Sequence, residues 1–546
     1  MGKRLNPRVS GIAVCLAVLG IAVGFKVVLL AMDAFPFNAD EAIVGLMARH
    51  ILDGHWPTFF YGQAYMGSLD ATLVALAMVV LGKHVLAIRI VQVLLYAGTV
   101  VTTMVLGWQI YRSRWAAWAA GLLMAIPSVN VTLYTTVSLG GYGEALLIGN
   151  LILILTLKID ESPDSSRLYV LWGALAGLGF WTFGLTLIYS LPCGIYILWK
   201  ASKHPRRRES ILRLALLSLS AVIGALPWVT WAISHGPGQL FDELLGSAIA
   251  GVSSGTPLGV ILSRIRYFTL LGTSVIFGLR PPWDARWLAL PLLPFALGFW
   301  LFVSATTIAA MKRTGGRQVG KMLLLGVSVC LILGYILTPF GADPSGRYFI
   351  PLAVPLSLFA AEFLVKWRLA IRKEWCVVLI LGILSYNLWG NLQTALRNPP
   401  GITTQFNAIT WIDHRYDDTL IEFLTRQDET RGYSNYWVAY PLAFLSEERL
   451  IYVPRLPYHL DFRYTPRDDR YESYDEQVAA AGRVAYITTN HDPLDKFLRN
   501  EFYERDIHWL EVHIGDYHIF YNLEPALHIE DMNAPWLLDG SLPTDE

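Results

Sequence analysis

The sequence predicts a mainly α-helical, polytopic membrane protein with a small α/β domain at its C-terminal end. Apolar runs recur from Ser10 to about Leu396, 54% of the 546 residues are hydrophobic, and only 16% are charged. The mean hydropathy of +0.43 is too high for a soluble chain of this size. The formal net charge of +0 gives no reason to expect a nucleic-acid partner.

The apolar runs predict about eleven transmembrane helices. The first run, Gly11 to Met32, is longer than the apolar part of a signal peptide and has no small-residue cleavage site after it, so we expect a retained span. The other expected spans are 85–110, 115–133, 145–159, two short ones between 168 and 199, 211–234, 287–311, 319–340, 349–367 and 375–396.

Clusters of Arg and Lys predict the orientation, because cytoplasmic loops are enriched in these residues. Five clusters fall on one side only if the short run Gly67 to Gly82, which contains Asp70, lies in the membrane interface and does not cross. We therefore expect an integral protein of the cytoplasmic membrane, with a cytoplasmic N-terminus and an extracytoplasmic C-terminal domain. The clusters are Lys3 to Arg8, Arg112 with Arg114, Lys200 to Arg208, Lys312 to Arg317 and Lys366 to Lys373.

A domain boundary is predicted near Asn398-Pro399-Pro400-Gly401, after which charge rises and no apolar run of spanning length follows. We expect residues 1–398 to form the transmembrane domain and residues 399–546 the α/β domain. The α/β domain shows no phosphate-binding loop and no nucleophile motif, so the sequence assigns it no chemistry. Its predicted elements are helices at 417–426 and 474–481, a strand at 485–488 and a hairpin of 511–514 with 517–521.

An acidic pair, Asp40-Glu41, begins an amphipathic helix in the first outer loop. One interpretation is structural, because Asn38 and Glu41 have the spacing of a capping box and Asp40 suits a first helical turn. The other is catalytic, because a carboxylate near the membrane surface can take a proton from an acceptor hydroxyl. Neighbouring residues on a helix diverge by about 100°, so within this pair we expect Asp40 to be the base and Glu41 to serve the cap.

A segment dense in aromatic residues and glycine, 55–67, follows that helix. It suits an aromatic belt at the membrane interface. It also suits a platform for a sugar or a lipid, in which Tyr61, Gln63 and Tyr65 would bind substrate. The nearby residues His50 and His55 are expected to be structural.

These motifs together resemble the N-terminal third of the glycosyltransferase C superfamily, and the most similar families are the protein O-mannosyltransferases and the aminoarabinose-transferase-like enzymes. The resemblance covers about Ser10 to Trp199 and returns near residue 346. It rests on Asp40-Glu41, Gly54-x-x-Pro57, Tyr61-Gly62-Gln63-x-Tyr65-x-Gly67, Leu81-Gly82, Ala87-Ile88-Arg89 and Gly346-Arg347-Tyr348-Phe349.

The resemblance implies a polyprenyl-phosphate-linked sugar as donor and an acidic residue of the first outer loop in the active site. Arg89 and Arg347 are expected at outer ends of spans, where guanidinium groups can hold the donor phosphate, with Tyr348 beside the substrate. Snorkelling is the alternative for both arginines, and pairing with Asp343 is a further alternative for Arg347.

Glu144 stands at the mouth of a span, after the glycine-rich loop that begins at Ser138. The family commonly has Asp at this place, so the role of Glu144, acceptor binding or contact with a divalent cation, stays open. No complete oxygen cage for a metal is recognisable in the sequence.

The sequence therefore predicts a membrane glycosyltransferase, a hexosyl- or pentosyltransferase, that acts on a hydroxyl of an acceptor protein, lipid or glycan. A transporter or flippase is the alternative, and it predicts internal repeats and helices broken at the bilayer midplane. A non-catalytic receptor or assembly factor is a third possibility. The polar candidates lie at the outer ends of spans, which favours the enzyme.

Overall fold

A computed structural model describes residues 7–249, 256–311, 318–343, 345–370 and 373–532, together with residues 534 and 537. Lys312 to Arg317, most of the cluster Lys3 to Arg8 and most of residues 533–546 lie outside these ranges. The chain divides into two compact units. The first unit is Met1–Ala34, Tyr65–Asp70 and Arg89–Leu396, and the second is Phe35–Ala64, Ala71–Ile88 and Arg397–Glu546.

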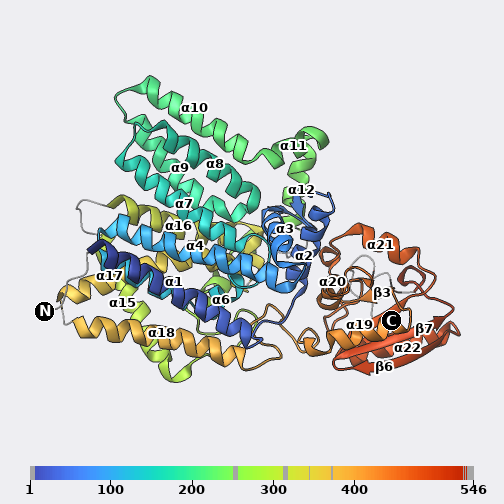
Figure 1. The fold of residues 1–546 in the computed structure, drawn as a ribbon. Coiled ribbons are helices and arrows are strands. Elements are labelled where there is room, and N and C mark those ends of the chain that lie inside the picture. Colours follow the sequence, from blue (N-terminus) through green and yellow to red (C-terminus); the bar gives the residue numbers. More distant parts are fainter. Residues whose placement is uncertain are drawn as a thin grey trace. The chain divides into compact units, whose positions relative to one another are not determined.

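The first unit is a bundle of apolar helices, in which α7, α8, α9 and α10 lie side by side (Figure 1). Many of its aliphatic side chains are exposed, as expected for helices that face lipid. The helices are α1 (Pro7–Ala31), α4 (Val85–Tyr111), α5 (Arg114–Ala125), α6 (Val129–Tyr134), α7 (Tyr142–Glu161), α8 (Ser166–Thr182), α9 (Leu187–Ser202), α10 (Arg207–Gly224), α11 (Leu226–His235), α12 (Pro237–Ile249), α13 (Pro257–Tyr267), α14 (Thr273–Ile276), α15 (Leu293–Met311), α16 (Gln318–Leu337), α17 (Ala353–Ala370) and α18 (Lys373–Ala395).

Among the described residues, nine helices are long and apolar enough to cross a membrane, or ten if the bent pair α10 and α11 forms one span. The predicted class, a multi-pass helical membrane protein, is confirmed. The helix breaks differ from the predicted ones in three places. The run 115–133 is broken into α5 and α6, and the run 211–234 bends by 68° between α10 and α11. Residues 257–276, which are not among the expected spans, form a continuous helix of spanning length.

Helices α8 and α10 approach each other closely because glycines line their contact. A Cβ atom built on Gly177 of α8 would lie 1.9 Å from the carbonyl oxygen of Ala221, and one built on Gly224 of α10 would lie 2.2 Å from that of Ala174. Gly173 is the third member of this row, four residues before Gly177. Small residues at this spacing let helix backbones pack in a membrane, where the hydrophobic effect does not drive helix association.

The run Gly67 to Gly82 forms helix α3 (Leu69–Leu81) of 13 residues. At 1.5 Å per residue its length is about 20 Å. The hydrocarbon core of a bilayer is about 30 Å thick. Helix α3 is therefore too short to cross, in agreement with its expected place at the interface.

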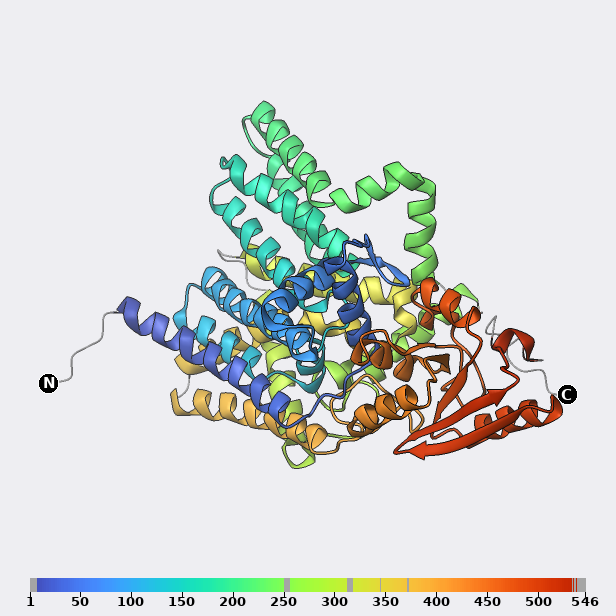
Figure 2. The ribbon, with the colours of Figure 1, turned by 45° about the vertical axis from the view of Figure 1, so that its right-hand side comes forward.

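The second unit contains a five-stranded sheet in the order β4-β3-β5-β7-β6. Strands β3 (Arg431–Ser434), β4 (Ile451–Val453) and β5 (Ala485–Thr489) are parallel, and β6 (His508–Ile514) with β7 (Tyr517–Glu524) form the antiparallel hairpin at one edge (Figure 2). The helices of this unit are α2 (Ala39–Leu52), all but the first two residues of α3, α19 (Asp417–Arg426), α20 (Tyr436–Leu445), α21 (Glu472–Ala479) and α22 (Asp492–Glu504).

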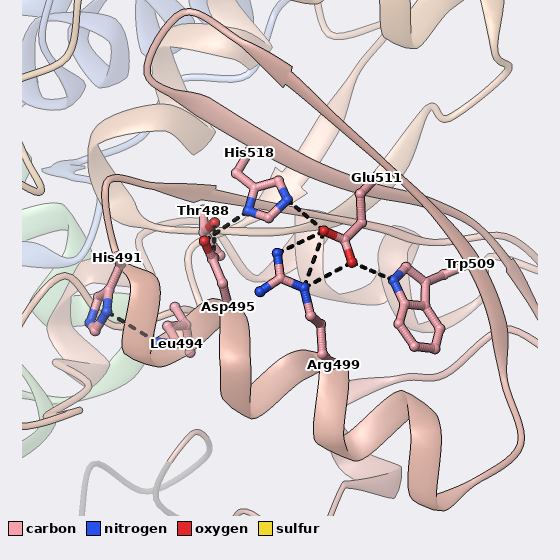
Figure 3. A network of polar contacts seen from close by, with 8 residues as sticks. All are labelled: Thr488, His491, Leu494, Asp495, Arg499, Trp509, Glu511 and His518. Atoms are coloured by element: carbon pink, nitrogen blue, oxygen red, sulfur yellow. Dashed lines mark hydrogen bonds and ion pairs between the residues drawn. The ribbon is translucent and has the colours of Figure 1, made fainter.

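A polar network, buried at His518 and Asp495 and open to solvent at Arg499 and Glu511, fixes α22 to the hairpin (Figure 3). His518 on β7 lies between two carboxylates, with Nδ1 2.8 Å from Asp495 and Nε2 3.0 Å from Glu511. Arg499 of α22 donates to both oxygens of Glu511, from Nε to Oε1 at 2.9 Å and from an Nη atom to Oε2 at 2.8 Å. The network therefore links α22 to both strands of the hairpin.

Most of the first loop, Phe35–Ala64, belongs to the same compact unit as the C-terminal residues. The short hairpin β1 (Phe59–Phe60) and β2 (Gln63–Gly67) follows α2 in this loop.

Candidate functional site

Helix α2 begins as the sequence predicts. Asn38 has extended backbone angles, and its side-chain oxygen accepts a hydrogen bond from the amide of Glu41 at 3.0 Å, as an N-cap residue does. Glu41 is fully buried, whereas Asp40 is only partly buried. The local geometry thus gives Asn38 the capping role and leaves Asp40 with access to solvent.

Asp40 has a partner that sequence reasoning missed. The hydroxyl of Tyr436, the first residue of α20, donates a hydrogen bond to Oδ1 of Asp40 at 2.6 Å. Burial, reinforced by the negative charge of Asp40, raises the pKa of Tyr436 well above its ordinary value. The phenol therefore stays protonated and remains the donor.

Two further charged groups lie close to this pair. The guanidinium of Arg470 lies 5.5 Å from the centre of the Tyr436 ring. Asp468 accepts a hydrogen bond from Tyr458 at 2.6 Å. Burial raises the pKa of Asp468 to about 6, although Arg470 and Tyr458 act in the opposite direction. A carboxyl group with a raised pKa therefore lies near the candidate base.

Helices α2 and α20 pack tightly along their length. Arg49 of α2 donates to the carbonyl oxygen of Phe444 at 2.6 Å, and its guanidinium lies 4.0 Å from the centre of the Phe444 ring. A Cβ atom on Gly45 would come within 2.5 Å of the same ring. The absence of a side chain at residue 45 is what allows Phe444 to reach α2.

The aromatic loop after α2 is fixed through His50. One ring nitrogen of His50 lies 2.7 Å from the hydroxyl of Tyr61, and the other lies 3.0 Å from Glu448. The ring of Tyr61 stacks on Tyr471 with centroids 4.7 Å apart. His50 therefore has the structural role that the sequence favours, and Tyr61 is held by it. Gln63, two residues after Tyr61, is the first residue of β2 and is partly buried.

Arg347 is the centre of a second group, in the first unit. It forms an ion pair with Asp343, and 31% of its side chain is exposed. Its guanidinium also lies 5.0 Å from the centre of the Tyr348 ring. The pairing with Asp343 that the sequence leaves open is present, and the side chain of Arg347 is partly exposed.

Aromatic side chains surround this arginine. The ring of Phe340 lies 5.5 Å from that of Tyr65 and 5.1 Å from that of Tyr348. The ring of Tyr142 lies 4.9 Å from that of Phe183. Tyr65, Tyr142 and Tyr348 are also close enough to Arg347 to act on it electrostatically. The structure thus brings three predicted residues, Tyr65, Arg347 and Tyr348, into one aromatic cluster.

Arg89 and Glu144 are also in the first unit, and both are buried. Arg89 lies in the second turn of α4 with 8% exposure, and Glu144 lies in the first turn of α7 with 2% exposure. Glu144 has Asp70 as an acidic neighbour.

The sequence indicates no function for Asp70, as it indicates none for Tyr436. Its Oδ1 accepts from the amide of Gln92 at 2.9 Å, and its Oδ2 accepts from the hydroxyl of Ser138 and from the amide of Gly141 at 3.5 Å. Burial raises its pKa, and these hydrogen bonds act against that shift. The only sequence feature that marks Asp70 is that it is a carboxylate within an apolar run.

The predicted residues thus fall into two groups. Asp40, Glu41, Tyr61 and Gln63 belong to the second unit, and Tyr65, Arg89, Glu144, Arg347 and Tyr348 belong to the first. No group of three or more His, Cys, Asp or Glu side chains with the geometry to hold a metal ion occurs in the part of the chain that the structure describes. A divalent cation stays a prediction.

Comparison with protein families finds no match for this sequence, and comparison with curated proteins finds none. Solved structures do match. The aminoarabinose transferase ArnT from Cupriavidus metallidurans bound to undecaprenyl phosphate has a TM-score of 0.56 at 13% identity, over 95% of this chain and 99% of that one. Its apo form gives a TM-score of 0.58 at 13% identity, over 95% and 98% of the two chains.

An archaeal enzyme of the same fold also matches. The oligosaccharyltransferase from Archaeoglobus fulgidus in its apo form has a TM-score of 0.55 at 12% identity, over 88% of this chain and 69% of that one. At these identities the likeness concerns the fold. The chain has the fold of the glycosyltransferase C superfamily, as its motifs predict.

Proposed function

We propose that this protein is a membrane glycosyltransferase that moves a sugar from a polyprenyl-phosphate-linked donor to an acceptor hydroxyl on the extracytoplasmic face of the cytoplasmic membrane. The observation that carries the proposal is the likeness to ArnT along nearly the whole of both chains, because that enzyme was crystallised with undecaprenyl phosphate. The partly exposed carboxylate of Asp40 in the first loop agrees with it.

Asp40 acts as the general base in this proposal. It accepts the proton of the acceptor hydroxyl while the acceptor oxygen forms a bond to the anomeric carbon of the sugar. The bond from that carbon to the phosphate oxygen breaks, and polyprenyl phosphate leaves with the electron pair. Attack opposite the leaving group inverts the anomeric configuration. Glu41 contributes through the geometry of the helix start, because its own carboxylate is buried.

The donor phosphate is the proposed ligand of Arg347 and Arg89. A guanidinium can bind two phosphate oxygens at once and stabilise the charge that develops as the glycosidic bond breaks. Arg347 suits this role because it is partly exposed and is neutralised by one carboxylate, that of Asp343, which a phosphate can replace. Tyr65, Tyr348 and Glu144 are proposed to bind the substrates in the first unit, and Tyr61 and Gln63 in the second.

The orientation follows from the same proposal. The first loop and the C-terminal residues share one unit, so both would be extracytoplasmic, and the N-terminus before α1 would be cytoplasmic. Accessibility to a membrane-impermeant thiol reagent at single cysteines introduced at Asp53 and Lys203 tests this orientation. We expect labelling from outside at residue 53 and none at residue 203.

The activity is tested with purified protein in lipid nanodiscs and a panel of polyprenyl-phosphate sugars. We expect one of the donors to be consumed, and Asp40→Asn to abolish its consumption. Asp53→Asn is the matched control, because Asp53 is the exposed carboxylate that ends the same helix. Full activity of Asp40→Asn would remove Asp40 from the reaction. Solute flux through reconstituted vesicles, with no donor consumed, would favour the transporter instead.

A further inference from the structure

We infer that Tyr436 is a positioning residue for Asp40, so that helix α20 of the C-terminal segment takes part in the proposed transfer. This inference rests on the proposed function of Asp40 as the base. It assigns a role in the reaction to a part of the chain in which the sequence shows no catalytic motif.

The contact between the two side chains is short and specific. The Tyr436 hydroxyl lies 2.6 Å from Oδ1 of Asp40, although 396 residues separate the two along the chain. The ring of Tyr436 is buried, with 4% exposure, and packs edge-on against Trp437 and Tyr440. The phenol therefore has little freedom to swing away from the carboxylate.

The start of α20 is fixed as well. Asn435, the residue before Tyr436, caps the helix by accepting from the amide of Trp437 at 3.0 Å, and it donates to the hydroxyl of Thr489 on β5 at 2.8 Å. The sheet of the second unit thus holds the backbone that carries Tyr436. At the other end, Arg49 and Phe444 lock α20 onto α2.

This arrangement leaves one oxygen of the base for the acceptor. Among the described residues, the hydrogen bond to the Asp40 side chain engages Oδ1. A donor on that oxygen stabilises the ionised carboxylate and fixes the direction of its second oxygen, as a base that takes a proton from a bound hydroxyl requires. The phenol acts on the acceptor only through Asp40.

Two other charged groups lie near this carboxylate. Asp468 and Arg470 approach from the segment before α21, whereas the side chain of Glu41, the next residue of the helix, is buried. The pKa of Asp468 is raised to about 6, so a change in the pH profile of activity cannot by itself be assigned to Asp40. The test therefore has to measure the protonation of the Asp40 carboxyl group directly.

The test measures carbodiimide labelling of Asp40 in the full-length protein in nanodiscs as a function of pH. Carbodiimide reacts with the protonated carboxyl group, and peptide fragmentation in the mass spectrometer distinguishes Asp40 from Glu41 and Asp468. Tyr436→Phe removes only the hydroxyl. We expect it to move the labelling midpoint of Asp40 to higher pH by roughly one unit, because the ionised form loses a hydrogen bond.

Tyr452→Phe is the matched control. Tyr452 is also fully buried in the second unit, and its hydroxyl donates to the carbonyl oxygen of Glu429 at 2.8 Å. Its substitution should leave the Asp40 midpoint in place. The acidic limb of the pH profile of sugar transfer should move in Tyr436→Phe as the labelling does, while the KM for the donor is unchanged.

The outcomes separate this inference from the proposed function. An Asp40 labelling midpoint that is the same in wild type and Tyr436→Phe overturns the positioning role, even if Asp40→Asn is inactive. An Asp40 midpoint that moves equally in Tyr452→Phe also overturns the positioning role, because the shift would then follow from the loss of any buried tyrosine hydroxyl in the second unit. Retained transfer by Asp40→Asn overturns the role of Asp40 as base, whatever the labelling shows.

Discussion

Asp70 and Gln92 are joined by a hydrogen bond of 2.9 Å between α3 and α4, and the same carboxylate receives the hydroxyl of Ser138. Asp70 therefore ties the start of α3 to the glycine-rich loop that leads to Glu144. Each of these donors is buried, so each needs the acceptor.

Asp70→Asn should destabilise the protein, because the amide group of Asn offers one acceptor oxygen where the carboxylate offers two. A buried donor left without an acceptor costs about 1–3 kcal/mol. We expect a lower thermal midpoint in detergent, measured by intrinsic fluorescence. Asp242→Asn, at an exposed carboxylate of α12, is the control and should behave as wild type. Equal midpoints for the two variants would contradict the bridging role of Asp70.

The glycine row between α8 and α10 makes a sharper steric prediction. Gly177→Ala places a methyl group where 1.9 Å is available, so the helices must separate, whereas Gly298→Ala in α15 meets nothing within 4 Å. We expect Gly177→Ala to lower the yield of monodisperse protein and its thermal midpoint. Gly298→Ala should keep both and even favour the helix, since Ala is the better helix former. A Gly177→Ala protein as stable as Gly298→Ala would show that the close contact is not required.

Much of the fold is predictable from the sequence because its signals are local. The cap at Asn38, the end of α2 before Gly54 and the turn at Gly515 follow from residue types within a few positions, and all three are present. Strands β3 and β4 were not predicted, since they have only 4 and 3 residues and no hairpin partner next to them in the chain.

The candidate site is less predictable for the same reason. Asp40 stands out because it begins a helix in the first loop, and Arg347 because of its motif. Tyr436 lies in an apolar helix interrupted by Pro441, where nothing local marks the hydroxyl as special. Its partner is 396 residues away, and only the tertiary packing of α2 on α20 brings them together.

That packing is itself testable. Phe444→Ala removes a side chain with 1% exposure, which typically costs about 3–5 kcal/mol for a buried Phe. Because Phe444 contacts α2 through Gly45 and Arg49, we expect the loop 55–63 to become sensitive to limited proteolysis. Phe423→Ala is the control, since that ring packs on Tyr521 of the hairpin.

Hydrogen exchange of β6 and β7 shows whether the sheet survives in Phe444→Ala. Unchanged exchange in the strands together with a cleaved loop is the expected result. A loop that stays resistant in Phe444→Ala would mean that α2 is held without α20.

Arg347→Lys tests the phosphate role without removing the charge. Lysine lacks the planar fork that binds two oxygens at once, so affinity for a polyprenyl phosphate should fall about tenfold or more. Equilibrium binding of a fluorescent polyprenyl phosphate in nanodiscs measures this. Arg286→Lys is a close control, because Arg286 has 30% side-chain exposure and pairs with Asp284 in the same unit. Equal affinities of the two variants would exclude Arg347 as a phosphate ligand.

The network around His518 predicts how the second unit responds to acid (Figure 3). The hydrogen bonds from Arg499, followed by those from Trp509 and His518, lower the pKa of Glu511 from its ordinary 4.5 to about 2. A carboxylate whose pKa is lower in the folded state stabilises the fold fully above about pH 4.5, and that contribution is lost between pH 4.5 and 2.

Glu511→Gln should therefore reduce the loss of stability that the second unit undergoes as the pH falls from 4.5 to 2. At pH 6 the variant is less stable than wild type, because Arg499 and His518 lose a charged acceptor, whereas near pH 2 the two proteins converge. Hydrogen exchange of the β6 and β7 peptides across this range measures the difference. Glu422→Gln, an exposed carboxylate on α19 paired with Arg426, is the control that should follow wild type. A Glu511→Gln protein whose stability difference from wild type is the same at pH 6 and pH 2 would show that the ionised carboxylate of Glu511 does not hold the hairpin to α22.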